Sequence, residues 1–319
     1  MSDSVASTTP PLVWIIGSGG LLGGAIAHEF PNSFQSTKIR WEKSGDSVKD
    51  LTANLEAFHD TAIENQEWII IWAAGHATVT SSQEECNQEL AVFESFVRLV
   101  SQQLTSHGRF FLASSAGGVY AASANPPFNA GSPTSPASPY GYLKLAQEHV
   151  VDSGFTNEKV VTTIAGRFSN LYGPGQDLTK LQGLVSRLVL AGLTKQIMSI
   201  FVPLDTLRDF IYVSDAAEVV RVILEMQDPP SIVVIASGEP KSLGAVVTQV
   251  KDVLRVNIPI SYGEHASSSG QSPDLRLQPT IACINLTPFP AGIKSVILDL
   301  TGRIQNHETK DHGGSASSL

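Results

Sequence analysis

The chain has 319 residues, a formal net charge of −9 and 42% hydrophobic residues, a composition typical of a globular protein with a large core. Because no basic tract offsets the acidic excess, we expect neither nucleic acid nor an anionic membrane surface as a partner. Cys86 and Cys283 form no CxxC motif, and the eight histidines show no metal-ligand spacing. We therefore predict no metal site and a reducing, cytoplasmic location.

The N-terminal segment predicts a short tail followed by a strand and a helix. Residues 1–10 are small and polar and are expected to be flexible. Leu12–Ile16 is a β-branched run, which indicates a strand buried on both faces, and Leu21–Phe30 predicts a helix. The apolar stretch imitates a signal peptide, but no lysine or arginine precedes Lys38, so no signal is predicted. No run is long enough for a membrane span.

A glycine-rich turn joins this strand to the helix, with the sequence Gly17-Ser18-Gly19-Gly20-Leu21-Leu22-Gly23. Glycines allow a tight turn and close approach of a pyrophosphate, and the helix N-terminus supplies N–H groups to it. The alternative is a structural turn that binds nothing. The residues predicted to contact a dinucleotide here are Gly17, Gly20, Leu21, Leu22 and Gly23.

The segment Lys38–Lys43 stands where a second strand is expected to choose the cofactor. Glu42 would bond the ribose 2′-hydroxyl of NAD, whereas Arg40 and Lys43 would accept the 2′-phosphate of NADP. Arg40 is therefore predicted to contact the cofactor, and both NAD and NADP stay open.

Further apolar runs predict buried strands, and amphipathic segments between them predict helices. The strands are expected at Trp68–Trp72, Arg109–Ala113, Val160–Ala165 and Ile232–Ala236. The helices are expected at Glu89–Gln103, Tyr140–Val151 and Asp215–Met226. This alternation indicates the α/β class, with a doubly wound parallel sheet of the Rossmann type.

The alternation weakens in two stretches, which predicts a smaller and discontinuous C-terminal substrate lobe. We assign residues 11–170 plus 207–237 to the dinucleotide-binding domain and residues 171–206 plus 238–306 to the lobe. Residues 307–319 are polar and are expected to form a second flexible tail. Ligands of such sheets bind at the carboxyl ends of the strands.

Three side chains at that edge form a candidate catalytic set. The apolar strand Arg109–Ala113 is followed directly by the hydroxyl side chains of Ser114 and Ser115. Tyr140 and Lys144 lie one helical turn apart on one face of a predicted helix. The ammonium group favours the ionised phenol, which is the form that acts as a base. We predict that Ser115, Tyr140 and Lys144 are catalytic and that Tyr140 and Lys144 also contact the cofactor. A surface pair on a helix is the alternative reading of the tyrosine and lysine.

In order along the chain, these motifs resemble the extended short-chain dehydrogenases, in the NAD-dependent epimerase/dehydratase family. The matching segments are Gly17–Gly23, Ala73–Gly75, Ser114–Tyr120, Ser138–Lys144, Arg167–Gly175 and Arg208–Asp215. The resemblance implies that Ala73, Ala74 and Gly75 line the cofactor, and that Asn170 and Arg208 contact the diphosphate of a nucleotide sugar. It also implies a homodimer formed through two helices.

The resemblance leaves two further side chains with structural alternatives. Arg167 is open between packing at its strand end and contact with the cofactor. Asp215 is interpreted as a helix cap.

The chain departs from the family pattern at several positions. An extra residue in Ala116-Gly117-Gly118 makes Ser114 an alternative to Ser115, and no Asp–Glu pair follows the serine, so dehydration is not predicted. Glu89 stands where Asn is usual. A late basic residue is missing, and Arg276 either replaces it or is a solvated charge.

Three functions are therefore compared. The first is an epimerase or keto-reductase of a nucleotide-activated sugar. The second keeps the chemistry but acts on a non-nucleotide alcohol or ketone. The third is a dinucleotide-binding sensor without turnover, against which the complete Ser115, Tyr140 and Lys144 set argues.

Overall fold

The computed structural model describes residues 9–63, 66–155, 160–179, 182–263, 272–282 and 285–313, with side chains as far as residue 306. The strands are β1 (Leu12–Ile16), β2 (Trp68–Trp72), β3 (Gly108–Ser115), β4 (Val161–Phe168), β5 (Asn170–Tyr172), β6 (Met198–Ile200), β7 (Leu207–Tyr212), β8 (Ile232–Ile235), β9 (Pro240–Ser242), β10 (Ile260–Tyr262) and β11 (Asp274–Leu275). The helices are α1 (Leu21–Glu29), α2 (Ser44–Thr61), α3 (Gln83–Gln103), α4 (Ala116–Val119), α5 (Pro139–Gly154), α6 (Leu184–Thr194), α7 (Val213–Glu225), α8 (Leu243–Leu254) and α9 (Phe289–Gly313).

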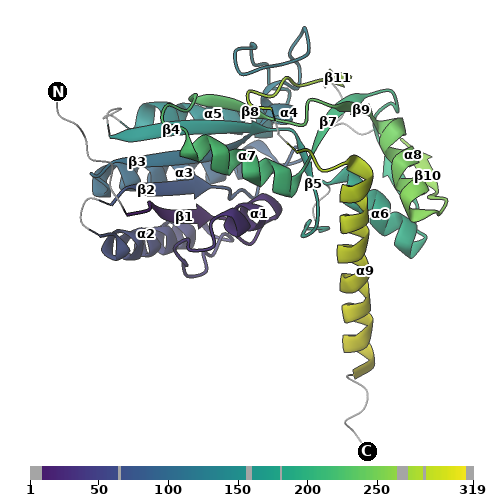
Figure 1. The fold of residues 1–319 in the computed structure, drawn as a ribbon, viewed down its shortest axis with the longest axis horizontal. Helices are drawn as coiled ribbons and strands as arrows, with labels where there is room; N and C mark the ends of the chain where they lie inside the picture. The colour runs from purple at the N-terminus through teal and green to yellow at the C-terminus, as the bar shows by residue number, and fades with distance from the viewer. Residues whose placement is uncertain are drawn as a thin grey trace, which may run out of the picture.

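The main sheet has the strand order β1-β2-β3-β4-β8, and every pairing in it is parallel. Helices α2, α3 and α5 pack on one face and α1 and α7 on the other, with one apolar core on each side (Figure 1). The prediction of a doubly wound α/β sheet is confirmed. The parallel register brings the carboxyl ends of β1, β2 and β3 to one edge.

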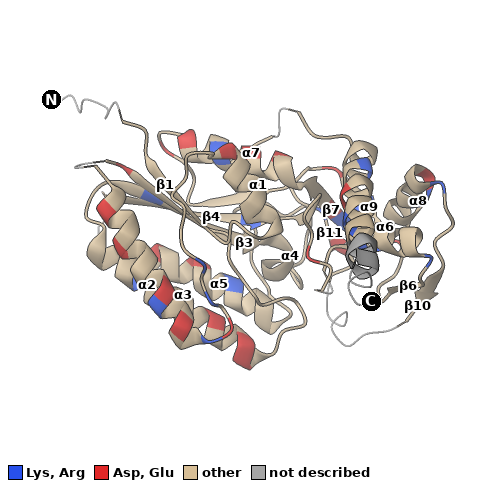
Figure 2. Ribbon diagram, turned by 90° about the horizontal axis from the view of Figure 1, so that it is seen from below, with Lys and Arg blue, Asp and Glu red and all other residues tan. Residues whose placement is uncertain are grey.

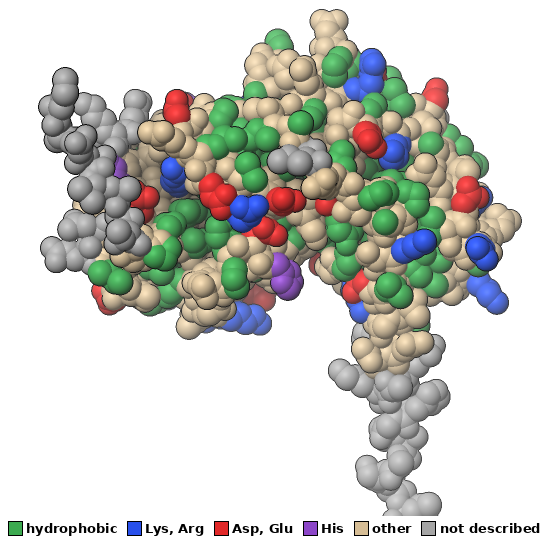
Figure 3. All heavy atoms as spheres, viewed as in Figure 1, with side chains coloured by type: hydrophobic (Ala, Val, Ile, Leu, Met, Phe, Trp, Pro, Cys, Tyr) green, Lys and Arg blue, Asp and Glu red, His purple; other side chains and the backbone are tan. Residues whose placement is uncertain are grey.

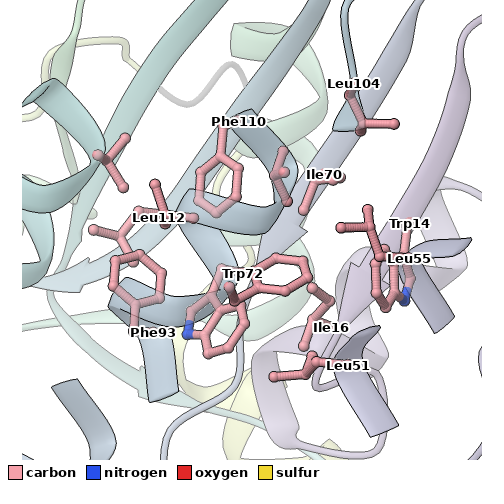
Figure 4. Packing of buried hydrophobic residues seen from close by; sticks show 14 of the residues in the cluster. Trp14, Ile16, Leu51, Leu55, Ile70, Trp72, Phe93, Leu104, Phe110 and Leu112 are labelled. Atoms are coloured by element: carbon pink, nitrogen blue, oxygen red, sulfur yellow. The ribbon is translucent and has the colours of Figure 1, made fainter. Parts of the chain in front are cut away.

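Strand β1 is buried on both faces, as its apolar run predicts. Trp14 and Ile16 face the core beneath α2, α3 and α5, whereas Val13 and Ile15 face α1 and α7. The Trp14 ring lies 5.6 Å from the ring of Phe58, and Figure 4 shows this core between sheet and helices. Complete burial of such a side chain contributes about 2–3 kcal/mol, so this core accounts for much of the stability.

Two local predictions need correction. Lys38–Lys43 does not form a strand, because the Arg40 N–H donates to the Asp50 carboxylate instead of to a neighbouring strand. In the described segment between α1 and α2, the bridge to β1 is made by Phe34. Helix α3 begins before the predicted Glu89, because Ser82 and Glu85 form a reciprocal capping box ahead of it.

A second group of elements forms the smaller lobe beside the sheet. Strand β7 pairs with β5, β9 and β11, strand β6 pairs with β10, and α6, α8 and α9 enclose a separate apolar core. Figure 1 shows α9 projecting from this lobe, and the helix continues to Gly313, inside the segment expected to be a tail. The domain boundaries stay a prediction.

Charged side chains are spread over the molecule. Figure 2 shows acidic residues along the outer sides of α2 and α3. On the face in Figure 3, acidic and basic side chains are interspersed with apolar ones. Within the described ranges, no helix is both long enough and apolar enough to span a membrane.

Candidate active site

The glycine turn packs directly against the end of β2. Gly17 has φ = +95°, and a Cβ atom there would lie 2.7 Å from the backbone nitrogen of Ala74 and 2.8 Å from the carbonyl carbon of Ala73. A Cβ atom at Gly23 would collide with the carbonyl group of Gly17. These glycines are therefore required by the backbone geometry, and they bring the predicted residues of two strand ends together.

The start of α1 fits a pyrophosphate. Gly20 is the N-cap residue and has no side chain to accept hydrogen bonds from the first N–H groups, and a Cβ atom at Gly19 would have no atom within 4 Å. The next residues, Leu21 and Leu22, begin the helix, and Leu22 is buried beneath it. Open backbone at a helix N-terminus is the arrangement that binds a dinucleotide phosphate.

Tyr140 and Lys144 lie together at the start of α5. The Lys144 Nζ atom lies 5.6 Å from the centroid of the Tyr140 ring. Ser138 caps the helix by accepting the Gly141 N–H, and Pro139 occupies the first turn, so the helix begins at the tyrosine. The predicted pair shares one face of the helix, as the spacing indicates.

The Lys144 ammonium is nearly buried, and polar groups from two helices surround it. It donates to Gln147 Oε1 at 2.9 Å and lies 3.9 Å from Glu89 Oε1. A Cβ atom at Gly75 would lie 3.7 Å from Lys144 Nζ, so the end of the predicted cofactor segment borders the ammonium directly. The glycine turn, the end of β2 and Lys144 thus lie next to one another.

The two candidate serines have different environments. Ser114 is buried and its Oγ atom donates to Glu148 Oε1 at 2.5 Å. Ser115 is partly exposed and accepts the Gly118 N–H at the start of α4, which leaves its own hydroxyl hydrogen free to donate. This difference favours Ser115 as the serine that meets a substrate.

Gly118, in the segment that carries the extra residue, packs on the tyrosine. A Cβ atom at Gly118 would lie 3.2 Å from Tyr140 Cε1. The absence of a side chain at Gly118 therefore allows α4 and the tyrosine helix α5 to approach closely. The insertion is visible in the sequence, but no local pattern indicates this contact.

Arg167 belongs to a buried network beneath the site. Its Nη2 atom donates to Glu148 Oε2 at 2.7 Å, and its Nη1 atom donates to the Tyr120 hydroxyl at 2.6 Å. Of the two roles left open for this arginine, packing at the strand end is the one that the geometry supports.

The predicted diphosphate residues lie at the border between the sheet and the lobe. Asn170 donates from Nδ2 to the Asp209 carbonyl oxygen at 2.8 Å. Arg208 donates to the Leu207 carbonyl oxygen, and no carboxylate of a described residue lies within 4 Å of its guanidinium. Burial lowers the pKa of Arg208 to about 10, and the charge of Asp274 acts in the opposite direction.

Two other expectations have definite outcomes. Arg276 is paired with Asp274, with Nη2–Oδ2 at 2.8 Å, so its charge is already compensated. The interpretation of Asp215 as a helix cap is wrong, because Tyr212 is the N-cap residue of α7 and the Asp215 carboxylate accepts from the N–H and hydroxyl of Thr287 instead. Asp215, on α7, thereby holds the segment that precedes α9.

Metal and thiol chemistry find no support among the described ranges. These ranges contain no cluster of three His, Cys, Asp or Glu side chains that could hold a metal ion. Cys86 is buried. Burial is the main cause that raises the pKa of its thiol, and the negative charge of Glu89 raises it further. Cys283 lies outside the described residues.

The chain is similar to known proteins of one family. The model of the NAD dependent epimerase/dehydratase family matches residues 13–236. A dTDP-L-rhamnose 4-epimerase of Burkholderia thailandensis is 33% identical over 110 residues, which are 34% of this chain and 30% of that protein. A putative UDP-glucose 4-epimerase of Methanocaldococcus jannaschii is 30% identical over 149 residues, 45% of this chain and 46% of that protein. The chain thus matches less than half the length of either relative.

Among solved structures, the UDP-glucose 4-epimerase of Thermotoga maritima with UDP-glucose superposes with a TM-score of 0.76 at 17% identity. The superposition covers 93% of this chain and 100% of that chain. At this identity the likeness concerns the fold.

Proposed function

Because the chain belongs to the NAD dependent epimerase/dehydratase family, we propose that it is an epimerase or keto-reductase that acts on a nucleotide-activated sugar. The observation that carries this proposal is the close approach of the glycine turn to Ala74 and of Gly75 to Lys144, whose Nζ atom lies 5.6 Å from the Tyr140 ring centroid. This arrangement supports a site that combines a turn for the dinucleotide phosphates with the Tyr140 and Lys144 pair.

The proposed roles of the side chains follow from their chemistry. A bound dinucleotide supplies the acceptor or donor of hydride. The Tyr140 phenolate takes the proton of the substrate hydroxyl during oxidation and returns it during reduction, and the Ser115 hydroxyl donates a hydrogen bond to the same substrate oxygen. The Lys144 ammonium supplies a positive charge beside the tyrosine, 5.6 Å from the centroid of its ring. Asn170 and Arg208 are the proposed contacts to the nucleotide diphosphate.

Epimerisation or reduction is favoured over dehydration by the residues that follow the serine. Removal of water from a sugar needs an acid and a base in addition to the tyrosine, whereas Ala116 and Gly117 stand there. The structural neighbours include the hexosamine 5,6-dehydratase TunA at 18% identity, so the fold alone does not separate these reactions. We propose a homodimer formed through α3 and α5, and a cytoplasmic location.

A second candidate is a reductase of a non-nucleotide alcohol or ketone. It is favoured by the pairing of Arg276 with Asp274, which leaves Arg208 as the cationic member of the two proposed diphosphate contacts. Calorimetry with UDP, dTDP and GDP separates the candidates. Binding of one nucleotide diphosphate supports the sugar substrate, and absence of binding by all three supports the second candidate.

Turnover tests the proposal itself. The purified protein is supplied with NAD or NADPH and a panel of nucleotide sugars and keto-sugars; conversion with catalytic cofactor indicates an epimerase, and stoichiometric consumption indicates a reductase. Tyr140→Phe should reduce kcat by about 100-fold or more while dinucleotide affinity stays nearly unchanged. Tyr142→Phe, at the exposed neighbouring tyrosine, is the control. A Tyr140→Phe protein with full activity would refute the assignment.

A further inference from the structure

We propose that Glu89 is a positioning residue of this site, which fixes the Lys144 ammonium and the loop after β2 with one carboxylate. For its catalytic part the inference rests on the proposed function. Glu89 lies on α3, where it faces α5, and its side chain is only 12% exposed.

One oxygen of the carboxylate anchors the loop. Glu89 Oε2 accepts the backbone N–H groups of His76 and Ala77, each at 2.8 Å. These residues follow Gly75 directly, so the anchor lies next to the segment that is predicted to line the cofactor. Hydrogen bonds to an ionised acceptor are roughly twice as strong as neutral ones, which suits a carboxylate to hold two successive peptide groups.

The other oxygen faces the catalytic lysine. Glu89 Oε1 lies 3.9 Å from Lys144 Nζ and accepts from Gln147 Nε2 at 3.4 Å, while Gln147 Oε1 accepts from the ammonium at 2.9 Å. The Lys144 side chain is 6% exposed. An ammonium so far from water requires a nearby opposite charge, and in the described part of the chain Glu89 is the carboxylate within 4 Å of it.

Gly75 completes the arrangement. A Cβ atom at this position would lie 3.2 Å from Glu89 Oε1 and 3.7 Å from Lys144 Nζ. A side chain at Gly75 would thus press on the carboxylate and touch the ammonium. The loop after β2, Glu89 and Lys144 therefore pack against one another. A substitution of Glu89 should affect both the loop and Lys144.

Glu89→Gln separates the two tasks. The amide keeps an oxygen that can accept the His76 and Ala77 N–H groups, but it carries no charge for Lys144. Amide hydrogen exchange at these two residues and NAD affinity should stay close to wild type. The kcat should fall about 10- to 100-fold with the substrate KM unchanged, because a small displacement of a catalytic group has an effect of this size.

Other variants of the helix provide the controls. Glu84→Gln makes the same charge change at an exposed position of α3 and should leave all three measurements unchanged. Glu89→Ala should lose both tasks, with faster amide exchange and weaker NAD binding. Glu89→Asp keeps the charge and should recover part of the kcat that Glu89→Gln loses. A Glu89→Gln protein whose kcat is within about twofold of Glu84→Gln overturns the proposal.

A readout without substrate distinguishes this inference from the proposed function. If the wild-type protein converts no nucleotide sugar, the proposed function fails, but the fixation of Lys144 can still be measured. Acylation of lysines followed by mass spectrometry should show Lys144 reacting several-fold faster in Glu89→Gln than in Glu84→Gln, because its amine is no longer held. Equal reaction rates in the two variants would refute the fixation of Lys144.

Discussion

The guanidinium of Arg40 forms a bidentate ion pair with the carboxylate of Asp50, with Nε–Oδ2 at 2.9 Å and Nη2–Oδ1 at 2.7 Å. The Arg40 N–H donates to the same carboxylate, and the hydrogen bonds from Arg40 lower the pKa of Asp50 to about 2. Asp46 lies 4.0 Å from the same guanidinium. The positive charge of Arg40, which could bind a 2′-phosphate, is therefore already compensated by Asp50 and Asp46.

We expect the protein to bind NAD more tightly than NADP, because a 2′-phosphate at Arg40 would also meet Asp46 and Asp50. Asp50→Asn removes one negative charge and releases the guanidinium, so the affinity for NADP relative to NAD should rise about tenfold, or about 1.4 kcal/mol. Calorimetry with both dinucleotides measures the ratio. Asp60→Asn, at an exposed acid of the same helix, is the control. Equal ratios in the two variants would contradict a role of Asp50.

Gly118 and Gly117 form a matched pair for testing the contact between α4 and the tyrosine. Gly118→Ala introduces a Cβ atom 3.2 Å from the Tyr140 ring, whereas the same atom at Gly117 has nothing within 4 Å. Gly118→Ala should therefore displace the phenol and lower kcat about tenfold, with unchanged folding. Gly117→Ala should be neutral in the same assay. If both variants keep full activity, the contact does not position the phenol.

The charge of Arg208 gives the site a pH limit. An arginine is cationic below its pKa, and burial lowers that of Arg208 to about 10. Affinity for a nucleoside diphosphate should therefore be retained at neutral pH and decline as the pH rises through about 10. Calorimetry with UDP across this range tests it, and a decline only at pH 12 would contradict it.

Replacement of Arg208 should change the affinity for UDP and the stability of the fold in opposite directions. Arg208→Met should weaken UDP binding about 10- to 100-fold, because it removes a charged hydrogen-bond donor. It should also raise the free energy of unfolding by about 1 kcal/mol, since the folded protein no longer buries a charge. Arg276→Met serves as the control for binding, because that guanidinium is already paired. Equal losses of UDP affinity in both variants would argue against a special role of Arg208.

The Arg167–Glu148 pair is expected to dominate the local stability. Both side chains are 7% exposed, so Glu148→Gln would leave a buried guanidinium without its counter-charge. The free energy of unfolding should fall by about 3–5 kcal/mol in urea denaturation. The exposed pair Arg221–Glu225 provides the comparison, and Glu225→Gln should cost less than about 1 kcal/mol. A loss below that limit for Glu148→Gln would show that the network is not structural.

Several features were predictable because short segments encode them. The alternation of Trp14 and Ile16 with Val13 and Ile15 follows from the two-residue period of a strand, so burial of β1 on both faces could be read directly. The glycine turn and the spacing of Tyr140 and Lys144 are equally local. A helical turn brings the latter two together wherever the helix lies.

Other features depended on which distant residues meet. Strand register places Ser114 beside Arg167, and α5 adds Glu148 to both; this contact distinguishes Ser114 from Ser115. No periodicity within one segment contains that information. Only the packing of one element on another could reveal it.

By itself, the sequence determined the fold class, through the alternation of strand and helix patterns. It also determined the glycine turn and the pairing of Tyr140 with Lys144, since each depends on neighbours within a few residues. The tertiary structure decided which charges are free and which are compensated: Arg40 by Asp50, Arg276 by Asp274, and Lys144 by Glu89 from another helix. The strength of a charge depends on its burial and on the distance to its partner, and packing sets both for residues such as Lys144 and Glu89.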